Sequence, residues 1–266
     1  MEGGEITMHE LKLAYGKSCY TKVWDNCSVT WEELCNRLKS TARTYETVEE
    51  YKAMNRDARS SVKDRGGFVG GHLKDGRRKI DHVECRSMIT LDADHAEPGF
   101  INRFARECKY AAVIYTTHSH TPDAPRARII VPLEREITPE RYAAVSRYFA
   151  SLWGIDQFDE CSYKVNQLMY WPTTSSDGEY ICRITKGSFL DADAFLANYP
   201  GWNDCTTLPK SSRETEIKIN SGKKQEDPLS KEGIVGAFCR TYTIENAIEK
   251  FLSDVYEPAA VDGRYS

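Results

Sequence analysis

No run of apolar residues in this sequence is long enough to cross a membrane, and the opening segment MEGGEITMHELKL lacks the basic and apolar regions of a secretory signal. The nine cysteines of the chain include no Cys-x-x-Cys pair. Their odd number and irregular spacing favour reduced thiols in the cytoplasm over disulfides. His82 and Cys85 have the spacing of half a zinc site, but no second half follows. We therefore expect no membrane association, no secretion and no structural zinc.

Positive charge is in the minority, since the net charge is −4, and this sum alone does not suggest a partner made of nucleic acid. Its distribution is more informative than the sum. Residues 52–86 contain ten Lys and Arg against five Asp and Glu. This local excess fits either a solvated surface loop or a patch that faces phosphates. The glycine-rich stretch 66–71 lacks the spacing of the known phosphate-binding loops, so we expect a turn or flexible loop there.

A chain of 266 residues, of which 40% are hydrophobic, can form one large or two modest domains with a real core. Near the N-terminus, Thr30 and Thr47 each precede a glutamate by three positions, which predicts a capping box and a helix after each. Residues 203–228 are polar, so we expect a linker. Residues 229–266 then predict a small helical segment with an amphipathic stripe that must bury its apolar side elsewhere. The stripe consists of Ile244, Ala247, Ile248, Phe251 and Leu252.

The middle of the chain predicts six elements in the order β-α-β-β-α-β, which is the ferredoxin-like or RNA-recognition-type unit. In such an α+β unit both helices pack on one face of the sheet, the other face is free for a ligand, and the first and third strands are central. The N-terminal part would add an α/β extension. The expected elements are strand 87–94, helix 100–108, strands 110–117 and 127–133, helix 139–152 and strand 167–171.

The first strand of this unit ends in two carboxylates, Asp92 and Asp94. Side chains two apart on a strand point to the same face, so these like charges would stand side by side. Such a pair is unfavourable unless a cation neutralises it. Mg²⁺ or Mn²⁺ binds carboxylate oxygens together with substrate phosphates, so a site for either ion is the favoured interpretation.

Three further groups fall where this topology would bring them near the Asp pair. A turn rich in histidine and hydroxyl groups follows the second strand, two arginines begin the third, and an acid precedes the fourth. Carboxylates, paired arginines and a histidine are what phosphoryl transfer to a nucleotide requires. Each residue alone could instead cap a turn or form a surface ion pair. The residues are His118, Ser119 and His120, then Arg126 and Arg128, then Asp159.

On these motifs the chain resembles the archaeo-eukaryotic primase superfamily. That family has a hydrophobic strand with Asp-x-Asp, then small-x-His, then a hydrophobic residue followed by an acid. The matching segments here are Ile89-Thr-Leu-Asp-Ala-Asp94, His118-Ser119-His120 and Phe158-Asp159. The segment THSHTPDAPRARIIVPL, with QLMYWP downstream, is similar to the sequences of primase-polymerase domains of phages and mobile elements. Those domains often precede a virulence-associated-protein-E-like helicase. The resemblance covers residues 65 to 266 and includes the tail GIVGAFCRTYTIENAIEKFLSDVYEP.

The resemblance implies a DNA-template-directed primase-polymerase that transfers nucleotides from NTP or dNTP by a two-metal mechanism. Asp92, Asp94 and Asp159 would be catalytic and would bind Mg²⁺ or Mn²⁺, while His118, Ser119, His120, Arg126 and Arg128 would bind the nucleotide. The motif histidine is His120 or His118, and the third acid is Asp159 or Asp156. Residues 1–202 would form the catalytic domain. Single-stranded DNA and a helicase in cis or in trans are the expected partners, and we expect the helical segment to be truncated.

Two other functions fit parts of the pattern. A rolling-circle nicking initiator uses a similar sheet, but it needs His-hydrophobic-His and a nucleophilic tyrosine, whereas Ser119 stands between the two histidines here. A non-catalytic single-strand-binding module would read bases with aromatic residues on its central strands, where this sequence has Asp and Arg.

Overall fold

The computed structural model describes residues 9–215, 237–238 and 240–251. The chain divides into two compact units, Met1–Ser212 and Arg213–Ser266, each of which is described by itself. No helix among the described residues is long and apolar enough to span a membrane.

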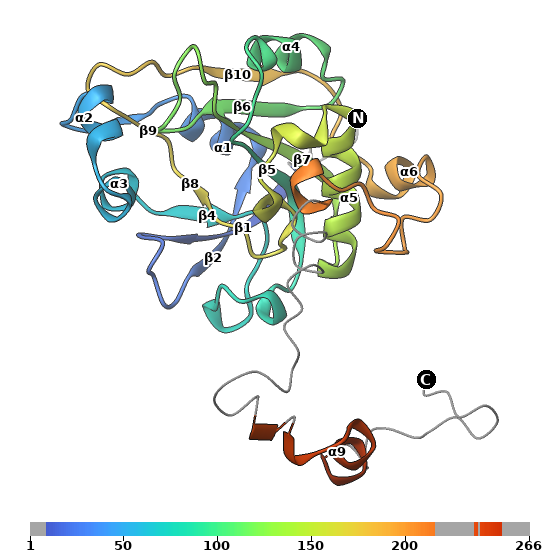
Figure 1. Cartoon of the computed structure of the whole chain (residues 1–266). Helices are drawn as coiled ribbons and strands as arrows, with labels where there is room; N and C mark the ends of the chain where they lie inside the picture. Colours follow the sequence, from blue (N-terminus) through green and yellow to red (C-terminus); the bar gives the residue numbers. More distant parts are fainter. Residues whose placement is uncertain (1–8, 216–236, 239, 252–266) are drawn as a thin grey trace, which may run out of the picture. The chain divides into compact units, whose positions relative to one another are not determined.

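The first unit is an α+β structure built on two four-stranded antiparallel sheets (Figure 1). One sheet has the order β2-β1-β4-β8, the other has the order β10-β6-β7-β5, and β3 and β9 form a short parallel pair. The strands of the first sheet are β1 (Glu10–Gly16), β2 (Asp25–Thr30), β4 (Gly67–Val69) and β8 (Met169–Tyr170). The others are β5 (Arg86–Ala93), β6 (Ala112–Thr116), β7 (Ala127–Ile137), β10 (Cys182–Thr185), β3 (Ala42–Arg43) and β9 (Thr173–Thr174).

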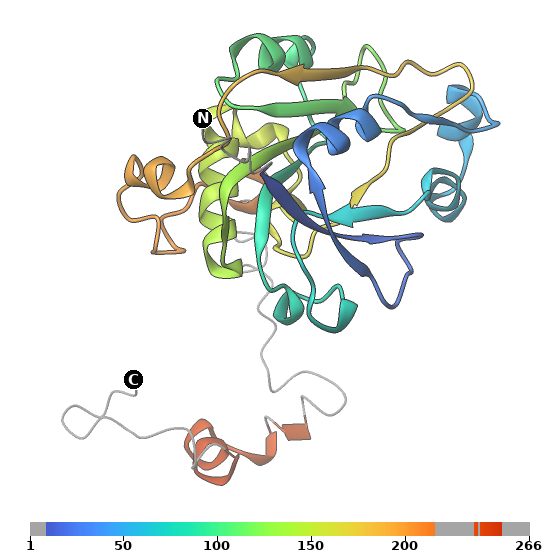
Figure 2. The same ribbon diagram turned by 180° about the vertical axis from the view of Figure 1, so that it is seen from behind.

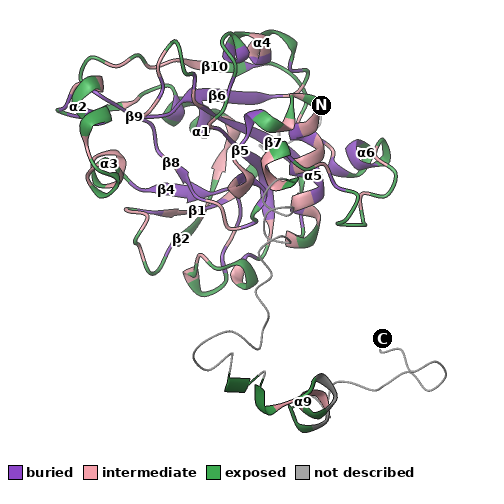
Figure 3. Ribbon diagram, viewed as in Figure 1, coloured by how far each residue is buried: buried purple, intermediate pink, exposed green. Residues whose placement is uncertain are grey.

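β5 and β6 are buried at every position and β7 is buried from Ala127 to Leu133, so this part of the second sheet is covered on both faces (Figure 3). On β5, Ile89 and Leu91 pack in one apolar cluster with α4 (Phe100–Glu107) and α5 (Pro139–Leu152). Met88 points to the opposite face and packs with Leu11 of β1 and Phe68 of β4. The helix α1 (Trp31–Leu38) belongs to that second cluster, and it comes to the front when the molecule is turned in Figure 2. The face expected to be free for a ligand is therefore largely occupied by the first sheet.

The helix starts predicted near the N-terminus are confirmed. Thr30 and Thr47 each accept a hydrogen bond from the backbone N–H three positions on, and the glutamate there bonds back, which completes both capping boxes. They precede α1 and α2 (Val48–Ala53), and Asn55 caps α3 (Arg56–Lys63). The pair α2 and α3 lies at one side of the unit, next to β9 and β8 (Figure 1).

Two expectations about strands are wrong. The glycine-rich stretch contains β4, which pairs with β8, instead of a flexible loop. A Cβ at Gly67 would lie 2.2 Å from the carbonyl oxygen of Met169 on β8, so only glycine permits this close pairing. The expected last strand, 167–171, contributes β8 to the first sheet, and β10 is added beside β6 instead. β5 therefore ends the second sheet, and the Asp pair is not central.

A short 3-10 helix, Glu160–Tyr163, and its cap take the place of a strand beside β5. The N–H of Asp159 donates to the carbonyl of Asp92 over 2.8 Å, and the N–H of Asp92 donates to Ser162 Oγ over 2.8 Å. These bonds satisfy the backbone N–H and carbonyl of Asp92 on the outer edge of β5, so no further strand is needed there.

The first unit extends to Ser212, beyond the expected boundary at 202. Leu208 is buried in the core, and Arg147 donates to the carbonyl of Pro209 over 2.8 Å. The helix α6 (Ala192–Ala197) lies shortly before this segment. In the second unit the described part contains α9 (Ile244–Phe251), and the ring of Phe251 packs with those of Phe238 and Tyr242, which precede this helix. Residues 216–236 of the expected linker and helical segment, and Leu252 of the expected stripe, lie outside the described residues.

Candidate functional site

Two ion pairs lie at the end of the second sheet, one between β5 and β7 and one between the residues that follow β5 and precede β7. Asp92 stands directly opposite Arg128, whose Nε and Nη2 both lie 3.3 Å from Asp92 Oδ2. Asp94 is paired with Arg126, whose Nη1 lies 3.5 Å from Asp94 Oδ1. The two carboxylates and the two arginines share one face because each pair is spaced i, i+2 on its strand. The arginines thus neutralise the acidic pair.

Asp92 is a deeply buried carboxylate. Burial raises the pKa of Asp92 to about 6; Arg128 opposes this rise, and the nearby charges of Asp94 and Asp159 add to it. Its Oδ2 receives both bonds from Arg128, whereas Oδ1 has no hydrogen-bond partner among the described residues. A buried oxygen without a donor suits a hard cation, so the chemistry of Asp92 and Asp94 fits Mg²⁺ or Mn²⁺. The described residues contain no group of three or more His, Cys, Asp or Glu side chains already arranged for a metal ion.

Of the two possible third acids, Asp159 lies next to Asp92, through the backbone bond beside β5. Its Oδ1 accepts from the N–H of Cys161 over 2.7 Å and so caps the 3-10 helix. Asp156 has a structural contact instead: its Oδ1 accepts hydrogen bonds from the N–H and the hydroxyl of Ser212, at the end of the first unit. Of the two acids, Asp159 is therefore the one whose backbone lies beside Asp92.

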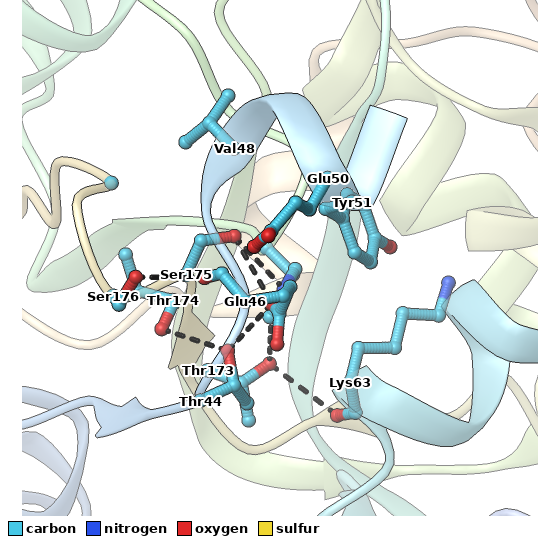
Figure 4. A network of polar contacts seen from close by, with 12 residues as sticks. Thr44, Glu46, Val48, Glu50, Tyr51, Lys63, Thr173, Thr174, Ser175 and Ser176 are labelled. Atoms are coloured by element: carbon cyan, nitrogen blue, oxygen red, sulfur yellow. Dashed lines mark hydrogen bonds and ion pairs between the residues drawn. The ribbon is translucent and has the colours of Figure 1, made fainter. Parts of the chain in front are cut away.

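His118 is held on both ring nitrogens by residues far away in the sequence. Its Nδ1 lies 2.9 Å from Thr173 Oγ1, and its Nε2 lies 2.9 Å from Glu46 Oε1. Thr44 donates to the same Glu46 oxygen over 2.7 Å and Ser175 over 3.2 Å. Figure 4 shows Glu46 surrounded by these groups from β9 and the loop before α2. Burial opposes the charge on Glu46, but the bonds from Thr44 and His118 hold its pKa below the ordinary value.

The other two residues of the turn are placed differently. Ser119 Oγ donates to the hydroxyl of Tyr51 over 3.4 Å, and the Tyr51 ring packs on His118 with centroids 4.3 Å apart. His120 Nδ1 accepts the backbone N–H of Arg126 over 3.3 Å, while its buried Nε2 has no partner within the described part of the chain. Both ring nitrogens of His118 are therefore hydrogen-bonded, whereas Nε2 of His120 is available for a ligand.

A cavity of about 110 Å³, here called the Asp cavity, brings most of the predicted residues together. Asp92, Asp94, His118, Ser119, Arg126 and Arg128 line it, whereas His120 and Asp159 do not. Sequence reasoning missed three of its other walls, Lys63, Tyr170 and Thr173. Burial is the main cause that lowers the pKa of Lys63, with Arg128 adding to it and the two aspartates opposing it. The local excess of positive charge in residues 52–86 includes Lys63, but it does not single out this residue.

Residues 6–211 match the family model described as the VapE N-terminal domain. No curated protein matches the chain. Among solved structures, the AEP domain of the cyanophage S-2L primase-polymerase has a TM-score of 0.40 and 8% identity, over 73% of this chain and 90% of that chain. A structure described as primase RepB′ has a TM-score of 0.38 and 8% identity, over 92% of this chain and 71% of that one. Likenesses this remote carry no argument about mechanism.

Proposed function

Because the chain belongs to the VapE N-terminal domain family, we propose that it is a primase-polymerase which acts in the replication of a phage or mobile element. It would join nucleotides from NTP or dNTP on a single-stranded DNA template. The observation that carries this proposal is the Asp cavity itself. Two carboxylates suited to divalent cations and two arginines suited to phosphates alternate across β5 and β7, and Lys63 adds a third positive charge.

Asp92 and Asp94 would hold Mg²⁺ or Mn²⁺, with Asp159 nearby on the other edge of β5. The bound ions would neutralise the phosphates and activate the attacking hydroxyl. Asp92 is ready to accept a cation through Oδ1, which has no competing donor among the described residues. When the carboxylates are neutralised in this way, Arg126 and Arg128 are released from them and can donate to the phosphates of the nucleotide.

The turn after β6 would complete the nucleotide site. Ser119 and His120 have hydrogen-bonding groups that are weakly engaged or unpartnered within the described residues, so both can contact the nucleotide. His118 would act by position instead, since Thr173 and Glu46 hold its two nitrogens. The resemblance implied a phosphate-binding histidine at one of these positions, and we assign that role to His120.

The test is incorporation of a labelled nucleotide on single-stranded DNA with Mn²⁺, with and without a primer. Asp92→Asn and Asp94→Asn keep the size of each side chain and remove its charge. We expect each to lose more than the roughly 10–100-fold that a change outside a ligand set costs. Asp25→Asn, at an exposed position of β2, is the matched control and should retain activity. Undiminished synthesis by the Asp92→Asn variant would contradict the proposal, and a covalent DNA adduct on a tyrosine would instead identify a nicking enzyme.

The remaining parts of the proposal concern partners. A helicase in cis or in trans is the partner expected of a VapE-type protein. Residues 229–266 would grip the template or the initiating nucleotide and lead towards that helicase.

A further inference from the structure

A second cavity, here called the cationic cavity, lies next to the Asp cavity. Its volume is about 220 Å³, and Lys52, Arg59 and Arg126 supply positive charges to its wall. Ser119 and His120 add a hydroxyl and an imidazole, and no Asp or Glu lines it. Two of these cations pair with acids outside the lining, Lys52 with Glu49 at 3.1 Å and Arg126 with Asp94 at 3.5 Å, whereas Arg59 has no ion pair among the described residues. The wall therefore keeps an excess of positive charge, which favours a ligand with several negative charges.

The two cavities share His118, Ser119 and Arg126 as lining residues. They are therefore neighbours on either side of the turn after β6 and the start of β7. A ligand that reached from one to the other would lie against Arg126, with the aspartates at one end and Lys52 and Arg59 at the other. A nucleoside triphosphate has this pattern of charge, since its α-phosphate is the reacting group and two more phosphates follow it.

The helix α3 presents one cation to each cavity. Arg59 and Lys63 are four residues apart, so they lie on the same face of the helix. Arg59 lines the cationic cavity and Lys63 lines the Asp cavity. The end of the helix is held against β9, because Thr173 Oγ1 donates to the carbonyl of Lys63 over 3.3 Å (Figure 4). This bond anchors the end of α3 beside the wall of the Asp cavity, which Thr173 and Lys63 both line.

His120 provides an independent reason to expect an anion. Because the N–H of Arg126 donates to Nδ1, the neutral ring carries its proton on Nε2. That Nε2–H is buried and has no acceptor among the described residues. Burial lowers the pKa of His120 and keeps the ring in this neutral form near pH 7, with Glu179 opposing. A buried donor without an acceptor costs free energy that a phosphate oxygen would remove.

Resting on the proposed function, we propose that the cationic cavity binds the β- and γ-phosphates of the incoming nucleotide, and that Lys52 and Arg59 are ligands for them. The pair α2 and α3 is then a specificity element, which selects nucleoside triphosphates over monophosphates. A DNA strand is the competing occupant of a positively charged surface. We favour the polyphosphate because the cavity adjoins the Asp cavity, which contains the proposed metal ligands, and shares Arg126 with it.

The experiment measures binding of inorganic tripolyphosphate to the full chain by calorimetry, without metal and at constant ionic strength. Lys52→Ala and Arg59→Ala should each weaken binding about tenfold, the loss expected for one charge-assisted contact. The matched control is Arg56→Ala, which removes the same charge from an exposed position one turn earlier on α3 but does not line the cavity. It should bind tripolyphosphate within about twofold of the unchanged chain, since only screened long-range charge is lost.

Equal weakening by Arg56→Ala and Arg59→Ala would overturn the inference, because the effect would then come from net charge alone. Unchanged tripolyphosphate binding with weakened binding of a single-stranded oligonucleotide would also overturn it and assign the cavity to the template. The outcome for the proposed function is separate. If Arg59→Ala weakens tripolyphosphate binding while the unchanged chain incorporates no nucleotide, the polyphosphate site stands and the polymerase does not.

Discussion

Replacing Glu46 by alanine should destabilise the first unit and disturb the site at the same time. Glu46 is buried and accepts from Thr44, His118 and Ser175 through one oxygen. Thr44 can turn to the carbonyl of Thr174, which already lies 3.2 Å away, so its hydroxyl loses little. Without Glu46, His118 Nε2 and Ser175 Oγ have only each other among the described residues, 3.3 Å apart, while His118 Nδ1 keeps Thr173. Two weakened buried donors at about 1–2 kcal/mol each give a loss of about 2–4 kcal/mol.

The assay is thermal unfolding of the full chain followed by circular dichroism. For a unit of this size, ~1 kcal/mol corresponds to about 2–4 °C, so Glu46→Ala should lower the melting temperature by about 4–16 °C. Glu46→Gln keeps an acceptor for two hydroxyls and should lose about half as much. Glu49→Ala is the control, because Glu49 is exposed on α2 and its pair with Lys52 belongs to the surface. It should change the melting temperature by less than about 2 °C.

A melting temperature for Glu46→Ala within the range of the Glu49→Ala control would refute this reasoning. It would mean that water or a neighbouring group replaces the carboxylate at no cost. The functional consequence is measured well below the melting temperature. With His118 no longer fixed by Glu46, the turn that carries Ser119 loses its anchor, and the nucleotide KM should rise more than kcat falls.

Three more results are expected. Arg128→Lys should raise the nucleotide KM about tenfold with template affinity unaltered, because a lysine cannot donate two directional bonds; weaker template binding at constant KM would place Arg128 on the DNA path. Since the pKa of Asp92 is raised to about 6, protons compete with Mn²⁺ for its carboxylate below that pH. The affinity for Mn²⁺ should therefore fall about tenfold for each pH unit below 6 and level off above pH ~7. A calorimetric affinity that stays constant from pH 5 to 8 would contradict this. A chain cut after Ser212 should stay folded and extend a primer, but it should not initiate on bare template. A cut after Gly201 should also lower the melting temperature, because it removes Leu208 from the core. Initiation by the chain cut after Ser212 would show that the tail is not needed.

Local patterns predicted the parts of the fold that depend on near neighbours. The capping boxes at Thr30 and Thr47 are formed by residues three positions apart, and the strand that carries Asp92 has apolar residues at four of its eight positions. The spacing of Asp92 with Asp94 also placed both on one face, because the period of a strand allows no other result.

The errors concern pairing between distant segments. Residues 167–171 have the composition of a strand, but composition does not say which sheet accepts them, and the close approach at Gly67 decides for β4. The same limit explains why Glu46 and Lys63 were missed. Nothing near them in the sequence shows that the N-terminal helices would line a cavity built on β5 and β7. Only the excess of basic residues indicated a surface for phosphates.

The bonds between Glu46 and the β9 segment have a consequence for the order in which the protein folds. Glu46 and Ser175 are separated by 129 positions. At about 5–20 residues per second, a ribosome needs roughly 6–26 s to add that length. Closing so long a loop also costs chain entropy before any bond is gained. The loop before α2 must therefore wait, with its carboxylate in water, until nearly the whole first unit has been synthesised. The wall that holds His118 is among the first parts of the chain to be made and among the last to find its place.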